Sequence, residues 1–192
     1  MKFTKGYWMN LPGVTNTDAV QVREVKVEND RVYLYTVPYH ADIRAMGGPL
    51  LEMYISSPQP DIIRTEAYHF MGGNQKMPAF ELNDAHCALE VENTETTVTI
   101  KSGNTKLVIG KNPCSFDYYY KDKKLTSIGN RFGNAMISTI STPDGNYMRA
   151  QMNLDIGEKV YGLGERFTPY VKNGQTVETW NEDGGTCTEI SY

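Results

Sequence analysis

Short alternating runs of apolar and polar residues, joined by turn-forming pairs, constrain the fold of this chain more than any other feature. Residues 24–28 alternate, and residues 31–37 form a β-branched and aromatic run. Asn29 and Asp30 separate the two runs, and two turn-forming residues between strand-like runs predict a β-hairpin. Since alternate side chains of a strand point to opposite faces, one face of this hairpin is expected to meet a core.

The same pattern recurs three more times along the chain. The three pairs of runs are residues 95–100 with 106–109, residues 115–120 with a strand beginning near Leu125, and residues 135–140 with 147–154. No window of about 11 residues carries a helical apolar stripe. The 13 tyrosines, 17 glycines and 9 prolines favour strands and turns over helices. The chain is therefore predicted to be all-β, an antiparallel β-sandwich that forms one domain over residues 1–192.

Charge and composition exclude several classes of protein. The net charge of −4 argues against a nucleic-acid-binding domain, which usually shows a basic excess. No run of about 18 apolar residues is present, so no membrane span is expected. Charge and glycine precede any apolar segment at the N-terminus, so no secretory signal is expected. The cysteines Cys87, Cys114 and Cys187 form no C-x-x-C pair, which favours a reducing cytoplasm and argues against a zinc site. We expect no metal and no cofactor.

Isolated catalytic residue types give little direction. His40, His69 and His86 show no metal-ligand spacing, and an isolated histidine in a β protein is more often structural than catalytic. Glycoside hydrolysis needs paired carboxylates, but 23 acidic residues produce chance pairs. The tyrosines at 118–120 could stack on sugar rings, yet strand alternation sends Tyr118 and Tyr120 to one face, so sheet packing is the stronger interpretation.

The most distinctive stretch lies near the C-terminus. Gly162 and Gly164 flank one residue, so the backbone there can adopt dihedral angles that are closed to other residues. Glu165 and Arg166 follow directly and can anchor a turn through charge-assisted hydrogen bonds. Residues 180–185 place an aromatic side chain before polar groups and two glycines. Such a loop suits sugar hydroxyls, but it also suits a tight turn, and the residues alone leave both interpretations open.

Taken together, these motifs resemble a known family. Residues 161–168, 173–181 and 183–186 closely resemble the N-terminal domain of bacterial α-xylosidases of glycoside hydrolase family 31. Supporting motifs stand in the same order upstream, at residues 6–8, 12–13, 57–59, 66–70, 101–104 and 146–148. The resemblance therefore covers essentially the whole chain.

The resemblance implies a galactose-mutarotase-like β-sandwich that precedes a (β/α)₈ barrel. Enzymes of that family are retaining and release α-linked xylose from xyloglucan oligosaccharides such as isoprimeverose, with both catalytic aspartates in the barrel. The resemblance therefore implies no catalytic residue in this chain. It implies instead that a loop of the N-terminal domain reaches the barrel mouth, with Asp183 the best candidate for a substrate contact and Trp180 and Thr186 beside it.

Several expectations follow from this resemblance. The isolated chain is predicted to be inactive, because a retaining glycosidase needs two carboxyl groups about 5–5.5 Å apart. The expected partners are an α-xyloside or α-glucoside oligosaccharide and the catalytic barrel. We also expect the sandwich to be incomplete at its C-terminal end, with an exposed edge that favours self-association into a homo-oligomer.

Two alternative functions stay open. One is a free-standing carbohydrate-binding module that uses the tyrosines or the Trp180 loop without catalysis. The other is an aldose-epimerase-like enzyme, which would need a histidine and a carboxylate in one groove.

Overall fold

The computed structural model describes residues 3–5, 9–38, 50–69, 86–129, 137–164, 167–177, 180–182, 185–187 and 190–191, with backbone only in the last three ranges. All regular structure in these residues is strand. The described part of the chain accordingly contains no helix long and apolar enough to cross a membrane. The chain divides into two compact units, Gly13–Asn153 and a second made of Met1–Pro12 with Leu154–Tyr192. The all-β prediction is confirmed, whereas a single domain over residues 1–192 stays a prediction.

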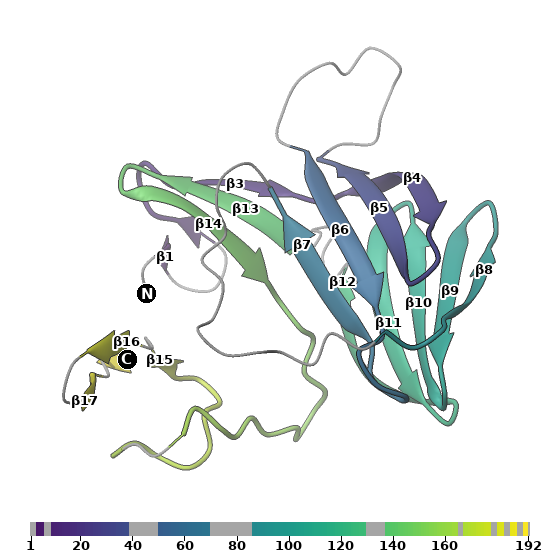
Figure 1. Ribbon diagram of the computed structural model, residues 1–192. Coiled ribbons are helices and arrows are strands. Elements are labelled where there is room, and N and C mark those ends of the chain that lie inside the picture. Colours follow the sequence, from purple (N-terminus) through teal and green to yellow (C-terminus); the bar gives the residue numbers. More distant parts are fainter. Residues whose placement is uncertain are drawn as a thin grey trace. The chain divides into compact units, whose positions relative to one another are not determined.

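The larger unit contains three antiparallel sheets (Figure 1). One has the order β4-β5-β6-β7, with strands Gln21–Val27, Arg31–Val37, Leu51–Ser56 and Arg64–Tyr68. A second has the order β12-β11-β10-β9-β8, with strands Lys123–Gly129, Cys114–Tyr120, Thr105–Lys111, Thr97–Ser102 and Glu90–Asn93. The third has the order β14-β13-β3, with strands Gly145–Ala150, Ile137–Thr142 and Thr15–Asp18.

All four predicted hairpins are present, as β4–β5, β9–β10, β11–β12 and β13–β14. In the first, Glu28 N donates to Arg31 O at 2.9 Å across the two-residue turn. Its register shifts between Val22 and Glu24, which is the point where the polar pair Arg23-Glu24 interrupts the alternation. An extra residue on one strand forms a β-bulge, so the break in the pattern has a structural cause.

The turn of the β11–β12 hairpin is shorter than the sequence predicts. Lys121 and Asp122 have positive φ angles of 46° and 63°, as a two-residue hairpin turn of the primed type requires. Lys123 and Lys124 therefore belong to β12 and pair with Tyr120 and Tyr119. Because primed turns match the natural twist of the strands, two residues are enough to reverse the chain here.

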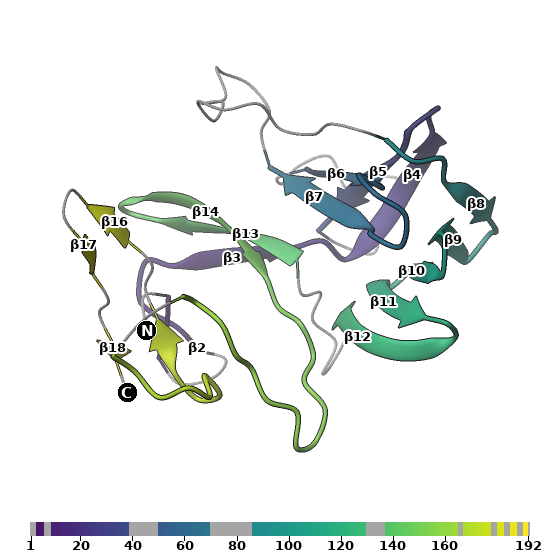
Figure 2. The same cartoon turned by 60° about the horizontal axis from the view of Figure 1, so that its bottom comes forward.

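The four- and five-stranded sheets lie face to face and share one core, as Figure 2 shows. Alternate side chains of each strand point into this core, as in β5, where Val32 and Leu34 are buried and Tyr33 is not. Fully buried side chains come from both sheets: Val32, Leu34, Leu51, Met53 and Ile55 from one, and Val98, Ile100, Leu107, Ile109 and Phe116 from the other. The predicted sandwich is therefore confirmed, and burial of apolar surface between the sheets is its main source of stability.

A polar clasp joins the two sheets at one end of the sandwich. Asp61, in the β6–β7 loop, accepts a hydrogen bond from Asn104 N in the β9–β10 turn, and its carbonyl accepts one from Thr105 Oγ1 at 2.6 Å. Beside it, the buried hydroxyls of Ser57 and Ser102 lie 2.6 Å apart. These contacts connect segments more than 40 residues apart in the sequence, so they fix how one sheet is placed on the other.

The smaller unit consists of short paired strands and long connections. Its pairs are β1 (Thr4–Lys5) with β2 (Met9–Asn10), β15 (Thr176–Val177) with β18 (Ile190–Ser191), and β16 (Trp180–Glu182) with β17 (Gly185–Cys187). Residues 154–164 of this unit belong to no named strand. The conformation of this unit is therefore held by hydrogen bonds within its loops and by short strand pairs, and not by a large sheet.

Candidate functional site

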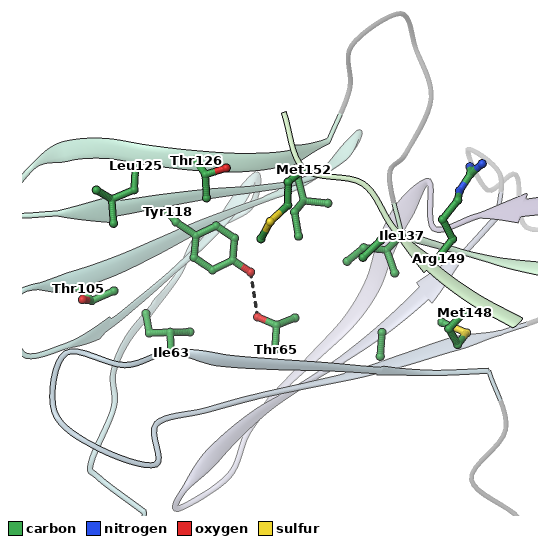
Figure 3. Close-up of a pocket in the computed structure, with 13 residues that line it drawn as sticks. Ile63, Thr65, Thr105, Tyr118, Leu125, Thr126, Ile137, Met148, Arg149 and Met152 are labelled. Atoms are coloured by element: carbon green, nitrogen blue, oxygen red, sulfur yellow. Dashed lines mark hydrogen bonds between the residues drawn. The ribbon is translucent and has the colours of Figure 1, made fainter. Parts of the chain in front are cut away.

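The sandwich unit contains a cavity of about 620 Å³ on one side of the two sheets (Figure 3). Its walls come from the edge strands β7 and β12, from β11, and from β14 and the residues after it. The lining residues are Ile63, Thr65, Ala67, Thr105, Tyr118, Leu125, Thr126, Ile128, Ile137, Met148, Arg149, Ala150 and Met152. The volume lies in the range of small-molecule sites, and most of the lining is apolar.

The centre of this inter-sheet cavity holds one hydroxyl pair. Tyr118 points from β11 toward Thr65 on β7, and the two hydroxyl oxygens lie 3.0 Å apart (Figure 3). Burial raises the pKa of the Tyr118 phenol, so the group stays neutral at physiological pH. The prediction that the tyrosines serve sheet packing is confirmed for Tyr118, which packs against the core.

The charged group of the cavity is already engaged. Arg149 Nη2 lies 3.3 Å from Asp18 Oδ1, and Arg149 Nε donates to Ser138 Oγ at 2.9 Å. The part of the lining that the structure describes contains no carboxylate and no histidine. The cavity can therefore receive apolar groups.

The aldose-epimerase alternative finds no support in the histidine geometry. His86 Nε2 lies 3.8 Å from Asp30 Oδ2, with side chains 37% and 47% exposed. Neither residue lines the inter-sheet cavity, and His69 Nδ1 lies 3.5 Å from the Leu50 carbonyl oxygen. Of the described histidines, His86 thus meets a carboxylate on the surface and not in the cavity, and His40 lies outside the described residues.

Among the residues whose side chains are described, no group of three or more metal-ligating side chains exists. Cys114 is buried, and burial raises its pKa to about 12, so its thiol is neither a ligand nor a nucleophile at neutral pH. Cys87 is half-buried. The described geometry therefore provides no site built for a metal ion or for thiol chemistry.

The glycine motif near the C-terminus forms a left-handed bend, as its sequence predicts. Gly162, Leu163 and Gly164 have φ angles of 121°, 69° and 72°. A positive φ is unfavourable for leucine but not for glycine. Because glycines occupy the other two positions of the bend, only Leu163 carries backbone strain. Glu165 and Arg166, the predicted charged anchor of this turn, lie outside the described residues.

Two of the three substrate-loop candidates lie on a short hairpin. In the pairing of β16 with β17, Trp180 is opposite Cys187 and Asn181 is opposite Thr186. The structure therefore brings the backbone of Trp180 and the backbone of Thr186 together on adjacent strands. Asp183, the third candidate, lies outside the described residues, and the role of all three in substrate binding stays a prediction.

Several structural residues of these regions were not predicted. One is the strand β7, Arg64–Tyr68, in which Thr65 and Ala67 line the cavity and alternate with Glu66 and Tyr68. This alternation is the sequence signal that could have predicted the strand. Lys172 is 9% exposed and was not singled out, although its Nζ donates to Thr168 Oγ1 at 2.6 Å and to Pro169 O at 2.7 Å. Nothing in the local sequence distinguishes such a buried lysine from a surface one.

Comparison with solved structures supports the fold. The cycloalternan-forming enzyme from Listeria monocytogenes, solved in complex with a pentasaccharide substrate, matches 91% of this chain and 15% of its own chain, with a TM-score of 0.66. Sequence identity over the match is 19%. At this identity the likeness concerns the fold alone.

Curated relatives are similar over the whole of this chain. The α-xylosidase XylQ of Lactiplantibacillus pentosus is 32% identical over 198 residues, which cover 100% of this chain and 25% of the relative. An α-xylosidase of Emericella nidulans is 33% identical over 216 residues, which cover 100% of this chain and 27% of the relative. The chain thus spans about a quarter of the length of these relatives.

A family model agrees with both comparisons and with the residues that carry the resemblance. The glycosyl hydrolase 31 N-terminal galactose mutarotase-like domain matches residues 52–191, which include the left-handed bend and the β16–β17 hairpin. Because this match covers well over half of the sequence, the chain belongs to the family of glycosyl hydrolase 31 N-terminal galactose mutarotase-like domains.

Proposed function

We propose that this chain is the non-catalytic N-terminal domain of a retaining glycoside hydrolase of the α-xylosidase or α-glucosidase type. In this role it supports a catalytic barrel and lends the Trp180–Thr186 hairpin to the substrate site. The observation that carries the proposal is the family match over residues 52–191, together with two relatives named as α-xylosidases that are about four times longer.

The chemistry of the sandwich supports a non-catalytic role. Retaining hydrolysis needs one carboxylate that attacks the sugar and another carboxyl group that protonates the leaving oxygen, about 5–5.5 Å apart. Among the described residues that line the inter-sheet cavity there is no carboxylate. A domain of this kind can position substrate, but the bond-breaking groups have to come from another part of the enzyme.

Within this proposal, Asp183 binds the sugar that leaves. A carboxylate accepts hydrogen bonds from two neighbouring hydroxyls, and an indole such as that of Trp180 offers an apolar face to a pyranose ring. Such contacts act on the leaving-group side of the scissile bond. Their loss is therefore expected to weaken reaction of substrates that carry a leaving sugar, and to spare substrates that carry none.

The test uses a chimera in which this chain replaces the matching N-terminal quarter of the Lactiplantibacillus pentosus α-xylosidase. We expect the chimera to hydrolyse both p-nitrophenyl α-xyloside and isoprimeverose. We expect Asp183→Asn to lower kcat/KM for isoprimeverose about 10-fold, as the loss of one charged hydrogen bond worth about 1.4 kcal/mol requires. With the p-nitrophenyl substrate, the same variant should change kcat/KM less than about 2-fold.

A matched control is Asp144→Asn, since Asp144 is an exposed aspartate in the β13–β14 turn. It should leave both substrates unaffected. Equal effects of Asp183→Asn on the two substrates, or no effect on either, would show that the hairpin makes no contact with the leaving sugar. An inactive chimera would argue against the proposed supporting role as a whole.

A further inference from the structure

The segment between the sandwich and the Trp180–Thr186 hairpin exposes a concentration of large apolar side chains. Ile156, Phe167 and Tyr170 are 106%, 110% and 81% exposed. Three further apolar residues nearby are 38–52% exposed, namely Val160, Tyr161 and Leu163. We call these six residues the apolar strip. Monomeric proteins rarely expose so many large apolar side chains within one short segment unless the surface binds something.

The apolar strip is held in shape by its own polar contacts. Asn173 Oδ1 accepts from Val160 N at 2.8 Å, and Asn173 Nδ2 donates to Glu158 O at 3.0 Å. Lys172 N donates to Val160 O at 2.8 Å. A segment of chain without regular strands is thus fixed by two adjacent residues that lie further along the sequence.

Two further contacts complete this framework. The Lys172 ammonium is held by Thr168 Oγ1 and the Pro169 carbonyl, and the rings of Tyr161 and Tyr170 pack with centroids 5.1 Å apart. Hydrogen bonds thus hold the backbone of this segment, while its large apolar side chains stay exposed. A surface that is ordered before binding loses little conformational entropy when a partner covers it.

We propose that the apolar strip is the surface on which the catalytic region of the enzyme packs. This inference rests on the proposed function and names the contact through which that function operates. The curated relatives are about four times longer than this chain, so a polypeptide of their kind has to bury a surface between this domain and the remainder. A strip of aliphatic and aromatic groups matches the apolar centre of such an interface.

The position of the strip along the chain supports this partner. Trp180 lies ten positions after Tyr170, and an extended chain of that length reaches at most about 35 Å. Docking of the strip would therefore hold the Trp180–Thr186 hairpin within that distance of the catalytic region. The same contact that buries the apolar side chains would restrict where the proposed substrate loop can lie.

The experiment measures how fast a cysteine in the strip reacts with iodoacetamide, with labelled peptides quantified by mass spectrometry. Phe167→Cys is compared in the 192-residue chain and in the chimera with the Lactiplantibacillus pentosus enzyme. We expect labelling at least 10-fold slower in the chimera. The matched control is Ile62→Cys, at a residue 47% exposed in the β6–β7 loop of the sandwich, which should react at the same rate in both proteins.

Each outcome separates this inference from the proposed function. Equal labelling of Phe167→Cys in both proteins overturns the inference, and an active chimera would then leave the proposed function standing. Slow labelling already in the 192-residue chain also overturns it, because the strip would then pack against its own chain. An inactive chimera with a protected cysteine supports the inference and counts against the proposed function.

A second measurement does not depend on labelling. The double variant Ile156→Ser with Phe167→Ser should leave the thermal midpoint of the 192-residue chain within about 1 °C of the parent, since both side chains are already exposed to water. In the chimera the same variant should lower the midpoint by several degrees. A fall in the isolated chain, or no fall in the chimera, contradicts the proposed interface.

Discussion

The clasp between the two sheets predicts that Asp61 stabilises the sandwich through its side chain and its backbone. Asp61 accepts from Asn104 N, and it does so with a positive φ of 66°. A hydrogen bond to a charged group contributes about 1.5–3 kcal/mol, and partial exposure places this one near the lower end. Alanine also tolerates a left-handed backbone less well than aspartate, at a cost of about 1 kcal/mol. We therefore expect Asp61→Ala to lower the free energy of unfolding by about 2.5 kcal/mol.

The neighbouring glycine gives this prediction an internal control. Gly103 has a φ of 58°, and a Cβ placed there would overlap the Asp61 carboxylate. Gly103→Ala should therefore cost about 2 kcal/mol, from backbone strain and from this overlap. In the double variant with Asp61→Ala the carboxylate is gone, so the combined loss should be smaller than the sum by about 1 kcal/mol.

Urea denaturation followed by far-UV circular dichroism measures these differences. Asp61→Asn keeps an acceptor oxygen and a residue type that tolerates positive φ, so it should lose less than half as much as Asp61→Ala. Asp144→Ala, in an exposed turn, should change stability by less than about 0.5 kcal/mol. The reasoning is refuted if Asp61→Ala and Asp61→Asn are equally stable, or if the losses from Asp61→Ala and Gly103→Ala add without coupling.

Three further substitutions probe the cavity and the five-stranded sheet. Tyr118→Phe removes the hydroxyl that pairs with Thr65 and should lower the free energy of unfolding by about 1 kcal/mol in a urea titration. Gly129→Ala should lower the free energy of unfolding by about 2 kcal/mol, because Gly129 has a φ of 139° and a Cβ there would lie 2.9 Å from Ser115 Cα. A melting temperature unchanged from the parent would contradict this. Burial raises the pKa of Cys114 from 9.0 to about 12. Above pH 9 the thiol ionises in the unfolded chain but stays protonated in the folded one, so the free energy of unfolding falls as the pH rises. Between pH 8 and pH 10 the parent should lose about 1.4 kcal/mol more stability than Cys114→Ala, and equal losses would refute the burial argument.

The hairpins of this fold could be predicted because each depends on neighbouring residues. Asn29-Asp30 sits between two alternating runs, and the structure forms the hairpin there with its bulge where the alternation breaks. The strand Leu51–Ser56 was not predicted, although its buried Leu51, Met53 and Ile55 also alternate. It pairs with β5 across a connection of more than a dozen residues, so no turn pair in the sequence marks its partner.

Contacts between distant segments could not be predicted from any local pattern. Asp61 follows a proline in a polar stretch that indicates only a loop, yet its carboxylate binds a turn 43 residues away. Tyr118 and Thr65 come together across the cavity from different sheets. The substrate-loop candidates depend on a resemblance carried by residues 161–186 and not on a local pattern. The exposure of the apolar strip depends on the folded structure, because the same residue types would be buried in a core.

The most direct test of the whole account compares hydrolysis of p-nitrophenyl α-xyloside by the purified 192-residue chain and by its chimera with the remaining three quarters of the Lactiplantibacillus pentosus enzyme. The account predicts no release of p-nitrophenol above background from the chain alone and clear release from the chimera. Hydrolysis by the chain alone would place catalytic groups within these 192 residues and contradict the account.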